Sequence, residues 1–183
     1  MSKQKRKKQA PPPFTIDRPG FEQAGRLLFV DIERELQLAR VPEEQHAALR
    51  ALGVEHVGGG NLLAALGLLC YTEFAGKLMF GHVRKDGRDK ASANFNSFFD
   101  ELGAEYAALR AKHDIYDLFR CGLAHEYYIK ETCTVFMFAK EQGIGIRERP
   151  DGTFAFVVED YCRDLKAAFP KVEAALIKRG VIT

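Results

Sequence analysis

The stretch "NLLAALGLLCYTEFAGKLMFG", residues 61–81, constrains this chain more than any other. It has the length of a long helix and is apolar nearly all round, and a helix of that kind is buried among other elements. Glu73 is its only acidic residue, and Lys77 follows one helical turn later. The stretch therefore predicts a central helix, and a chain of 183 residues is long enough to surround it in one domain.

Further helices are expected on both sides of this stretch, because apolar side chains recur there with helical spacing. Asn61 is expected to cap the central helix at its N-terminus. The triple glycine at 58–60 precedes that helix, but no Lys-Ser/Thr pair follows at P-loop spacing, so a link between helices is expected there. The other expected helices span 21–40, 43–52, 95–111, 114–128 and 159–179, the last of them kinked or broken near Pro170.

The period of the sequence changes after residue 132. The segments "TVFMFAK" and "TFAFVV" are rich in β-branched and aromatic residues, and "RPDG" places a turn directly before the second. They predict a small antiparallel sheet of two or three strands at about 133–158. The expected fold is therefore mainly α, an up-and-down helical bundle over 14–183 with a small antiparallel β-hairpin inserted before the last helix.

Positive charge is concentrated at the N-terminus. Without the five basic residues of the first ten, the chain has 22 basic and 25 acidic residues, so its body is not expected to be a strongly basic nucleic-acid binder. The basic run ends in "PPP", which predicts a disordered basic and proline-rich tail over residues 1–13. A solvated tail, a contact with nucleic acid and a targeting signal all stay open for this segment.

The sequence also bears on the compartment. No apolar run follows the basic N-terminus, and the longest uncharged stretch has 16 residues, four of them glycine, so neither a secretory signal nor a membrane span is expected. No two cysteines have C-x-x-C spacing, which favours buried thiols in a reducing cytoplasm. Without H-E-x-x-H or a carboxylate cluster at metal spacing, we expect no metal and no cofactor. The four cysteines are Cys70, Cys121, Cys133 and Cys162.

The candidate chemistry lies in "FRCGLAHEYYIK", residues 119–130, where Arg120 and His125 fall within one expected helix. Arginine offers a planar fork of donors that matches phosphate oxygens. Histidine has an unperturbed pKa near 6.5 and can exchange protons at neutral pH. Together they could drive attack of a ribose 2′-hydroxyl on the neighbouring phosphodiester.

The spacing of this pair sets a geometric condition. On a straight α-helix, positions five apart are splayed by about 140° and separated by about 7.5 Å along the axis. Either the helix distorts at Gly122, or two copies of the helix assemble one site. Cys121, Gly122 and Ala124 are small and permit close approach of another helix, so we expect a homodimer with this helix at or near the interface.

Glu73 has two interpretations on the central helix. A buried carboxylate is costly unless it is paired, so it is expected to form a salt bridge with Lys77 or with a nearby arginine. In the functional interpretation, it orients the arginine of the site.

The segment "IYDLFRCGLAHEYYIK" resembles the signature of the HEPN superfamily, an arginine followed after four to six residues by a histidine near the end of one helix of a four- or five-helix bundle. The resemblance covers roughly residues 21–130. Many members are metal-independent ribonucleases that act as dimers, found in toxin–antitoxin, phage-defence and stress systems. Others are inactive modules that bind nucleotides or partners.

The resemblance implies Arg120 and His125 as catalytic residues, with Glu73 as an acidic residue near the arginine and Lys130 just past the histidine. Active members often carry Asn, Asp or His directly after the arginine, where this chain has Cys121. The implied function is a metal-independent endoribonuclease working across a homodimer cleft. The alternatives are a non-catalytic module that binds a nucleotide, RNA or a protein, and a nucleotide-binding partner of a nucleotidyltransferase.

Overall fold

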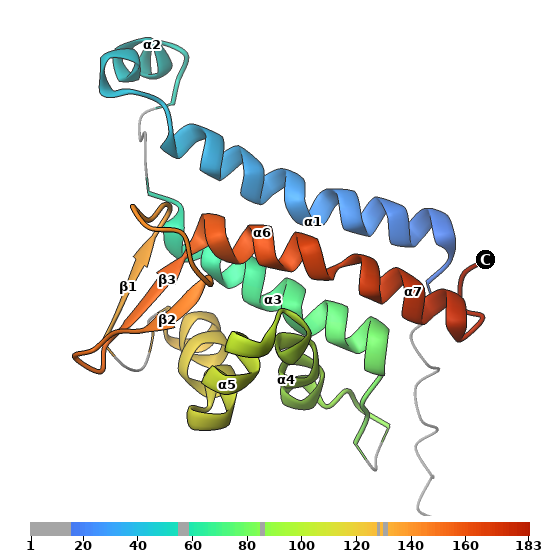
Figure 1. Cartoon of the computed structure of the whole chain (residues 1–183). Helices are drawn as coiled ribbons and strands as arrows, with labels where there is room; N and C mark the ends of the chain where they lie inside the picture. The colour runs from blue at the N-terminus through green and yellow to red at the C-terminus, as the bar shows by residue number, and fades with distance from the viewer. Residues whose placement is uncertain (1–15, 55–58, 85–86, 128, 130–131) are drawn as a thin grey trace, which may run out of the picture.

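A long apolar helix, α3 (Asn61–Phe80), runs through the middle of the molecule, as the sequence predicts (Figure 1). It packs against α1, α4, α6, α7 and the π-helix η2. Among the described helices, α3 alone is long and apolar enough to cross a membrane, but 44% of its apolar window is buried inside the protein. The packing of α3 against five other helices is that of a core helix, and the cytoplasmic location stays a prediction.

The computed structural model describes residues 16–54, 59–84, 87–127, 129 and 132–183, so the predicted tail over 1–13 and Lys130 lie outside the described residues. One hydrophobic core joins its helices and sheet. In chain order, the other elements are α1 (Arg18–Ala39), η1 (Glu43–Gln45), α2 (His46–Ala51), α4 (Ala91–Glu101), α5 (Ala104–Lys112), η2 (Tyr116–Glu126), β1 (Cys133–Phe136), β2 (Ile146–Glu148), β3 (Phe154–Val157), α6 (Val158–Ala168) and α7 (Pro170–Lys178).

Two helical segments divide where their sequences contain a breaker. The single helix expected over 95–111 is two helices, α4 and α5, because Gly103 between them adopts φ +148°, which side-chain-bearing residues rarely occupy. Arg110 of α5 then reaches back to Asp100 of α4 with two hydrogen bonds of 2.5 and 2.6 Å. The expected break near Pro170 is confirmed, because α6 ends at Ala168 and α7 begins at the proline.

The fold is mainly helical, with a small sheet before the last helices, as expected, but the sheet is mixed. Its strand order is β1-β3-β2, with β2 antiparallel to β3 and β1 parallel to it. The connection from β1 to β2 passes over α6, where a Cβ on Gly145 would lie 2.3 Å from the Tyr161 Cβ. That crossing brings β2 to the far edge of β3, so the two segments that predicted the sheet, now β1 and β3, pair in parallel, and the antiparallel hairpin is formed by β2 and β3 instead.

The N-terminus of α3 differs from the expected cap. Gly60 precedes the helix in the left-handed region, with φ +71°, and no side-chain oxygen caps the first turn. The Asn61 side chain instead donates a 2.8 Å hydrogen bond to the carbonyl of Val135 in β1. Asn61 therefore ties the sheet to the start of the central helix.

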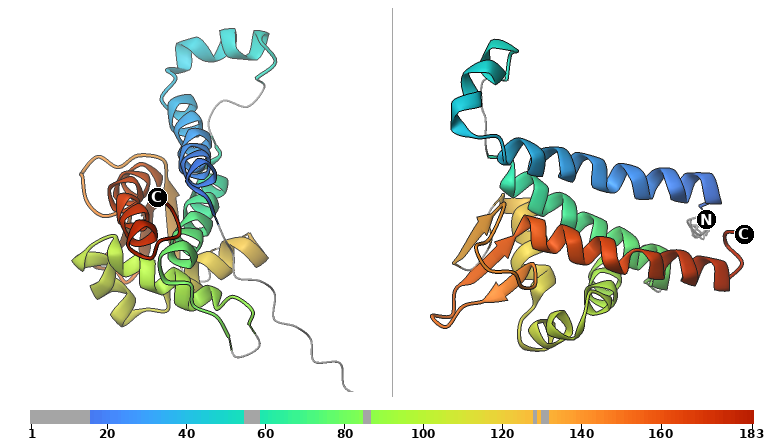
Figure 2. Two further views of the ribbon diagram at one scale, coloured as in Figure 1. Left: turned by 90° about the vertical axis from the view of Figure 1, so that its right-hand side faces the viewer. Right: turned by 45° about the horizontal axis from the view of Figure 1, so that its top comes forward.

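Between α1 and α3 the chain leaves the body as an arm, residues 41–54, which contains η1 and α2 and projects past the end of α1 (Figures 1 and 2). Neither η1 nor α2 contains a buried residue. Leu52, directly after α2, is 81% exposed. The arm is thus helical without contributing to the hydrophobic core.

Buried aromatic and aliphatic side chains fix η2 between α3, α4 and the sheet. Phe119 lies edge-on to Phe154 of β3, with ring centroids 5.4 Å apart, and both side chains are fully buried. Ile115 and Leu123, on either side of Phe119 along the chain, are buried as well. These contacts determine which way Arg120, the residue after Phe119, is directed.

Candidate functional site

The helix that carries Arg120 and His125 is a π-helix. Its closing hydrogen bond runs from the Tyr127 amide to the Gly122 carbonyl, five residues earlier. In an α-helix the partner would be four residues earlier, and the wider turn of η2 reduces the splay between positions five apart. The 140° splay of a straight α-helix therefore does not apply, and the alternative of a distorted helix describes this chain. Extended π-helical segments are rare, and π-bulges often mark functional sites.

Arg120 forms an ion pair with Glu73 of α3. The Arg120 Nε and Glu73 Oε2 atoms lie 2.8 Å apart, and the two side chains are 20% and 22% exposed. Neither atom has a hydrogen bond of acceptable direction, although the separation is short. Among the described residues, the one other buried side-chain oxygen or nitrogen without such a bond is Asn96 Oδ1. Glu73 therefore pairs with the site arginine, which was one of its two expected partners.

The other expected partner, Lys77, forms an ion pair with Asp89, with 2.6 Å between Nζ and Oδ2. Asp89 lies in the loop between α3 and α4, beyond the end of the central helix. Glu73 and Lys77 are one turn apart on α3, so the two ion pairs follow each other along the same side of the helix.

Two further side chains, Cys70 and Tyr116, lie beside the ion pair. Burial lowers the pKa of Arg120, but the Glu73 carboxylate, with smaller contributions from Cys70 and Tyr116, outweighs it and raises that pKa above its ordinary value. Burial, followed by the charge of Glu73, raises the pKa of Tyr116 to about 12. Burial also raises the pKa of the Cys70 thiol. The arginine is thus a permanent cation beside neutral thiol and phenol groups.

Cys121 follows Arg120 but has a different environment. It is half-buried, and its thiol adds a small contribution to the raised pKa of Tyr116, five residues earlier. The Tyr116 ring lies 5.9 Å from the Arg120 guanidinium carbon, measured to the ring centroid. Tyr116, which the sequence does not single out, therefore lies beside both Arg120 and Cys121.

His125 is exposed at the end of η2, as are Ala124 and Glu126. His46 and His82 each contact a polar partner, the carbonyl of Val41 and the hydroxyl of Ser97, both at 3.1 Å. An exposed imidazole on the same helix as a partly buried arginine leaves the histidine accessible to a substrate. This arrangement differs from that of a binding module in which Arg120 and His125 would both be fully buried and hydrogen-bonded within one chain.

Tyr127 ends the π-helix in a conformation that costs free energy. Among the described residues it is the one non-glycine residue with positive φ, at +52°, and its side chain is 60% exposed. The left-handed region costs an L-residue roughly 1–2 kcal/mol. Backbone strain of this kind tends to occur at functional sites.

The small-residue patch expected at a dimer interface is divided. Gly122 is buried within the single chain, Cys121 is half-buried, and only Ala124 is exposed. A larger side chain at Gly122 would therefore disturb the fold itself and would not report selectively on a dimer. Exposed apolar side chains do lie nearby on α3 and η2, because Leu63 is 61% exposed and Tyr127 ends the helix.

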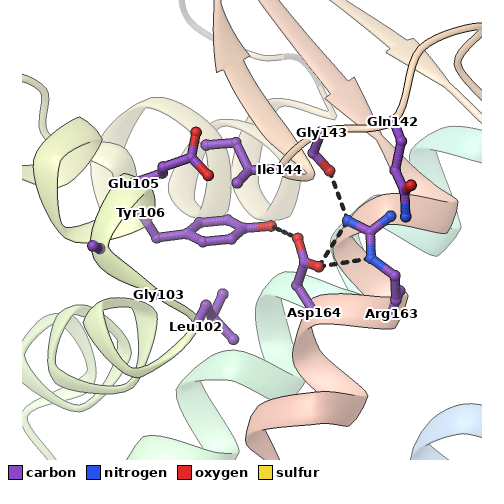
Figure 3. A pocket seen from close by; sticks show the side chains of 10 residues that line it. Leu102, Gly103, Glu105, Tyr106, Gln142, Gly143, Ile144, Arg163 and Asp164 are labelled. Atoms are coloured by element: carbon purple, nitrogen blue, oxygen red, sulfur yellow. Dashed lines mark hydrogen bonds and ion pairs between the residues drawn. The ribbon is translucent and has the colours of Figure 1, made fainter.

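A cavity lies away from this site. It has a volume of about 460 Å³ and lies between α5, α6 and the segment before β2 (Figure 3). The Tyr106 hydroxyl donates a 2.6 Å hydrogen bond to Asp164 and accepts one of 2.7 Å from the Gly145 amide. Arg163 donates to both Asp164 and the Gly143 carbonyl, at 2.9 and 2.6 Å. We call these five residues the Tyr106–Asp164 network.

This network stabilises the fold. Burial, reinforced by the bond to Asp164, strongly raises the pKa of Tyr106, so the phenol stays neutral and keeps donating. Arg163 also pairs with the buried Asp160, at 2.6 Å, and Arg147 bonds the other oxygen of Asp160. Because these donors and acceptors are matched to one another, we place the candidate site at Arg120 and not at this cavity.

No group of three or more His, Cys, Asp or Glu side chains within the described residues is placed to hold a metal ion. Comparisons of the chain with protein-family models, with curated proteins and with solved structures find no match. The resemblance to the HEPN superfamily rests on the residues around Arg120 and His125, and membership stays a prediction.

Proposed function

We propose that the protein is a metal-independent endoribonuclease of the HEPN type, in which Arg120 and His125 act on a phosphodiester of RNA. The observation that carries the proposal is the combination on η2 of an exposed imidazole with an arginine that is paired with a partly buried carboxylate. The ion pair keeps the guanidinium directed without enclosing it completely. The exposed histidine can reach a bound substrate.

In the proposed reaction, the 2′-hydroxyl of the substrate attacks the adjacent phosphorus, and the bond from phosphorus to the 5′-oxygen of the next nucleotide breaks. His125 accepts the proton of the 2′-hydroxyl or donates one to the leaving 5′-oxygen. Arg120 stabilises the negative charge that develops on the phosphoryl oxygens. The products are a 2′,3′-cyclic phosphate and a 5′-hydroxyl.

The test is incubation of purified protein with single-stranded RNA in the presence of EDTA, followed by analysis of the new ends. We expect cyclic phosphate ends, no cleavage of DNA, and a fall of about 10²–10³ in rate for both His125→Ala and Arg120→Ala. Glu126→Gln is the matched control, because Glu126 is the exposed neighbour of His125 and should keep the activity. Cleavage that needs a metal, or that persists in His125→Ala, would rule out this mechanism.

The proposal includes a homodimer with the exposed end of η2 near the interface. Ala124 and Leu63 are apolar and exposed in the single chain, and a second copy would cover such side chains. Ala124→Arg should therefore convert a dimer to a monomer without affecting the core. Light scattering on the unmodified protein and on this variant tests for the dimer. An unmodified protein that is monomeric at micromolar concentration would contradict the proposed dimer.

The second candidate is a non-catalytic module that binds a nucleotide or a protein. The observation that favours it is Cys121, a half-buried cysteine that stands directly after the arginine, where active members of the HEPN superfamily often carry Asn, Asp or His. This alternative predicts stabilisation by a nucleotide without cleavage of any RNA. A thermal shift with nucleotides, measured beside the cleavage assay, separates the two.

A further inference from the structure

The loop between α3 and α4 forms a small basic hairpin. Its two arms, His82–Arg84 and Gly87–Lys90, pair in antiparallel fashion through a bridge between Val83 and Asp89. The Arg84 amide donates to the Arg88 carbonyl at 2.6 Å, and the Lys90 amide donates to the His82 carbonyl at 2.9 Å. We call these two arms the basic hairpin.

The basic hairpin is held in a fixed position by buried groups. Asn94 of α4, only 1% exposed, accepts a 2.8 Å hydrogen bond from the His82 amide and donates one of 3.2 Å to the His82 carbonyl. The His82 ring contacts the Ser97 hydroxyl at 3.1 Å and stacks on Phe80, with centroids 5.8 Å apart. A loop that only carried charge into solvent would not need a buried asparagine to orient it.

A close contact between helices makes this arrangement possible. A Cβ on Gly76 of α3 would lie 1.9 Å from the Asn94 carbonyl oxygen, so only glycine lets α4 approach there. The approach brings the start of α4, and with it the base of the basic hairpin, against the last turns of α3.

The surface of the basic hairpin has the composition of a nucleic-acid contact. Arg84, Arg88 and Lys90 are exposed, and the acidic Asp89 is already paired with Lys77. Phe80 and Val83 add apolar surface, being 36% and 59% exposed. Cations that bind phosphates, beside an exposed aromatic ring, are the combination that single-stranded nucleic acid contacts.

The basic hairpin is continuous with the candidate site. Arg120 pairs with Glu73, and one turn along α3, about 6 Å, Lys77 pairs with Asp89 of the hairpin. The two ion pairs therefore form a line from the site arginine to the hairpin.

We propose that the basic hairpin binds the phosphate backbone of single-stranded RNA next to the phosphodiester at Arg120 and His125. This inference rests on the proposed function, because it assigns the path of the same substrate. The hairpin supplies affinity and positions the strand, whereas the reaction takes place on η2.

The experiment measures binding of a fluorescently labelled 20-nucleotide single-stranded RNA as a function of salt concentration. His125→Ala serves as the background, so that cleavage does not interfere. Arg84→Gln/Lys90→Gln removes two charges from the hairpin. Arg26→Gln/Arg50→Gln, from exposed positions on α1 and the arm, removes the same charge elsewhere and is the matched control.

We expect the hairpin variant to lose about tenfold or more in affinity at 0.1 M salt and its salt slope to fall by about 1.4, since each lost contact with a single strand removes about 0.7. The control variant should change little. All variants should melt close to the background protein, because the substituted side chains are exposed; if the hairpin pair does not, Arg84→Gln alone carries the test.

The outcomes separate the two proposals. If the background protein binds RNA and the two double variants behave alike, the hairpin inference is wrong and the proposed function stands. If the background protein does not bind RNA even at low salt, the proposed function fails and the hairpin inference fails with it.

Discussion

Two polar clusters in this molecule have opposite character. In the Tyr106–Asp164 network, the phenol, the carboxylate and the guanidinium each have well-directed partners, and the cluster joins α5, α6 and the segment before β2. At Arg120 and Glu73, two charged atoms lie 2.8 Å apart without a well-directed hydrogen bond. Strong, well-directed bonds hold the first cluster in one arrangement, whereas the second contains two buried polar atoms that lack a well-directed hydrogen bond. The cavity beside the network is therefore a poorer guide to function here than the less satisfied ion pair.

The largest effect is expected from a substitution that breaks the Tyr106–Asp164 network. Asp164→Ala removes the acceptor of both Tyr106 and Arg163, and should lower the free energy of unfolding by about 2–3 kcal/mol, because a buried hydroxyl and a guanidinium lose their partner. Denaturant titration measures the loss. Glu105→Ala, an exposed residue of the same cavity, should stay within about 0.5 kcal/mol. Equal free energies of unfolding for the two variants would show that the network does not stabilise the fold.

The second largest effect is expected at the ion pair of the candidate site, and it concerns activity and not stability. Glu73→Gln keeps the shape of the side chain but removes the charge that positions Arg120, so cleavage should fall about tenfold to hundredfold. The loss should appear in kcat, with KM little changed, and the free energy of unfolding should fall by only about 1 kcal/mol. Steady-state kinetics beside denaturant titration would contradict this if stability fell as far as in Asp164→Ala while kcat was unchanged.

Alkaline pH should weaken the packing around β1 and α6 without ionising the phenol at the site. Burial raises the pKa of Cys133 and of Cys162 from an ordinary 9.0 to about 11. The unfolded chain loses these thiol protons first, so their contribution to stability is complete below pH 9 and is lost as the pH rises to about 11. Denaturant titrations across this range should show the fall, and Cys133→Ala/Cys162→Ala should flatten it. Tyr116 at the site, with a pKa of about 12, stays protonated over the same range.

The smallest effect concerns the strained end of η2. Tyr127→Gly relieves the left-handed backbone strain, roughly 1–2 kcal/mol, and offsets it with roughly 0.5–1 kcal/mol of added chain entropy. The melting temperature should therefore rise by a few degrees at most, whereas Tyr127→Phe should leave it unchanged. A lower melting temperature for the glycine variant would show that the exposed ring contributes more than the strain costs.

Much of the helical fold follows from hydrophobic periodicity, because each helix buries one face. The π-helix does not follow from it. Ile115, Phe119 and Leu123 are buried at intervals of four residues, which an α-helix would also show, so spacing cannot reveal the wider turn. The pairing of Arg120 with Glu73 could be proposed from the sequence, since a carboxylate inside an apolar helix needs a cation.

Other features depend on contacts between residues far apart in sequence. The parallel pairing of β1 depends on how the chain crosses α6 at Gly145, and strand composition does not encode that crossing. The Tyr106–Asp164 network joins residues 58 positions apart in the chain without any shared motif. Asn61 looked like a helix cap, but the geometry of Gly60 directs its side chain to the sheet instead.

The arm has a consequence for dividing this protein into pieces. A six-residue helix with no buried side chain has little to hold it closed, so α2 should be the first helix to exchange its amide hydrogens and an early target of proteases. A cut there would separate α1 from the rest of the chain in sequence but not in space, because α1 packs on α3 and α6. The arm is therefore the natural position at which to split the protein into two fragments that reassemble, or to insert a reporter domain.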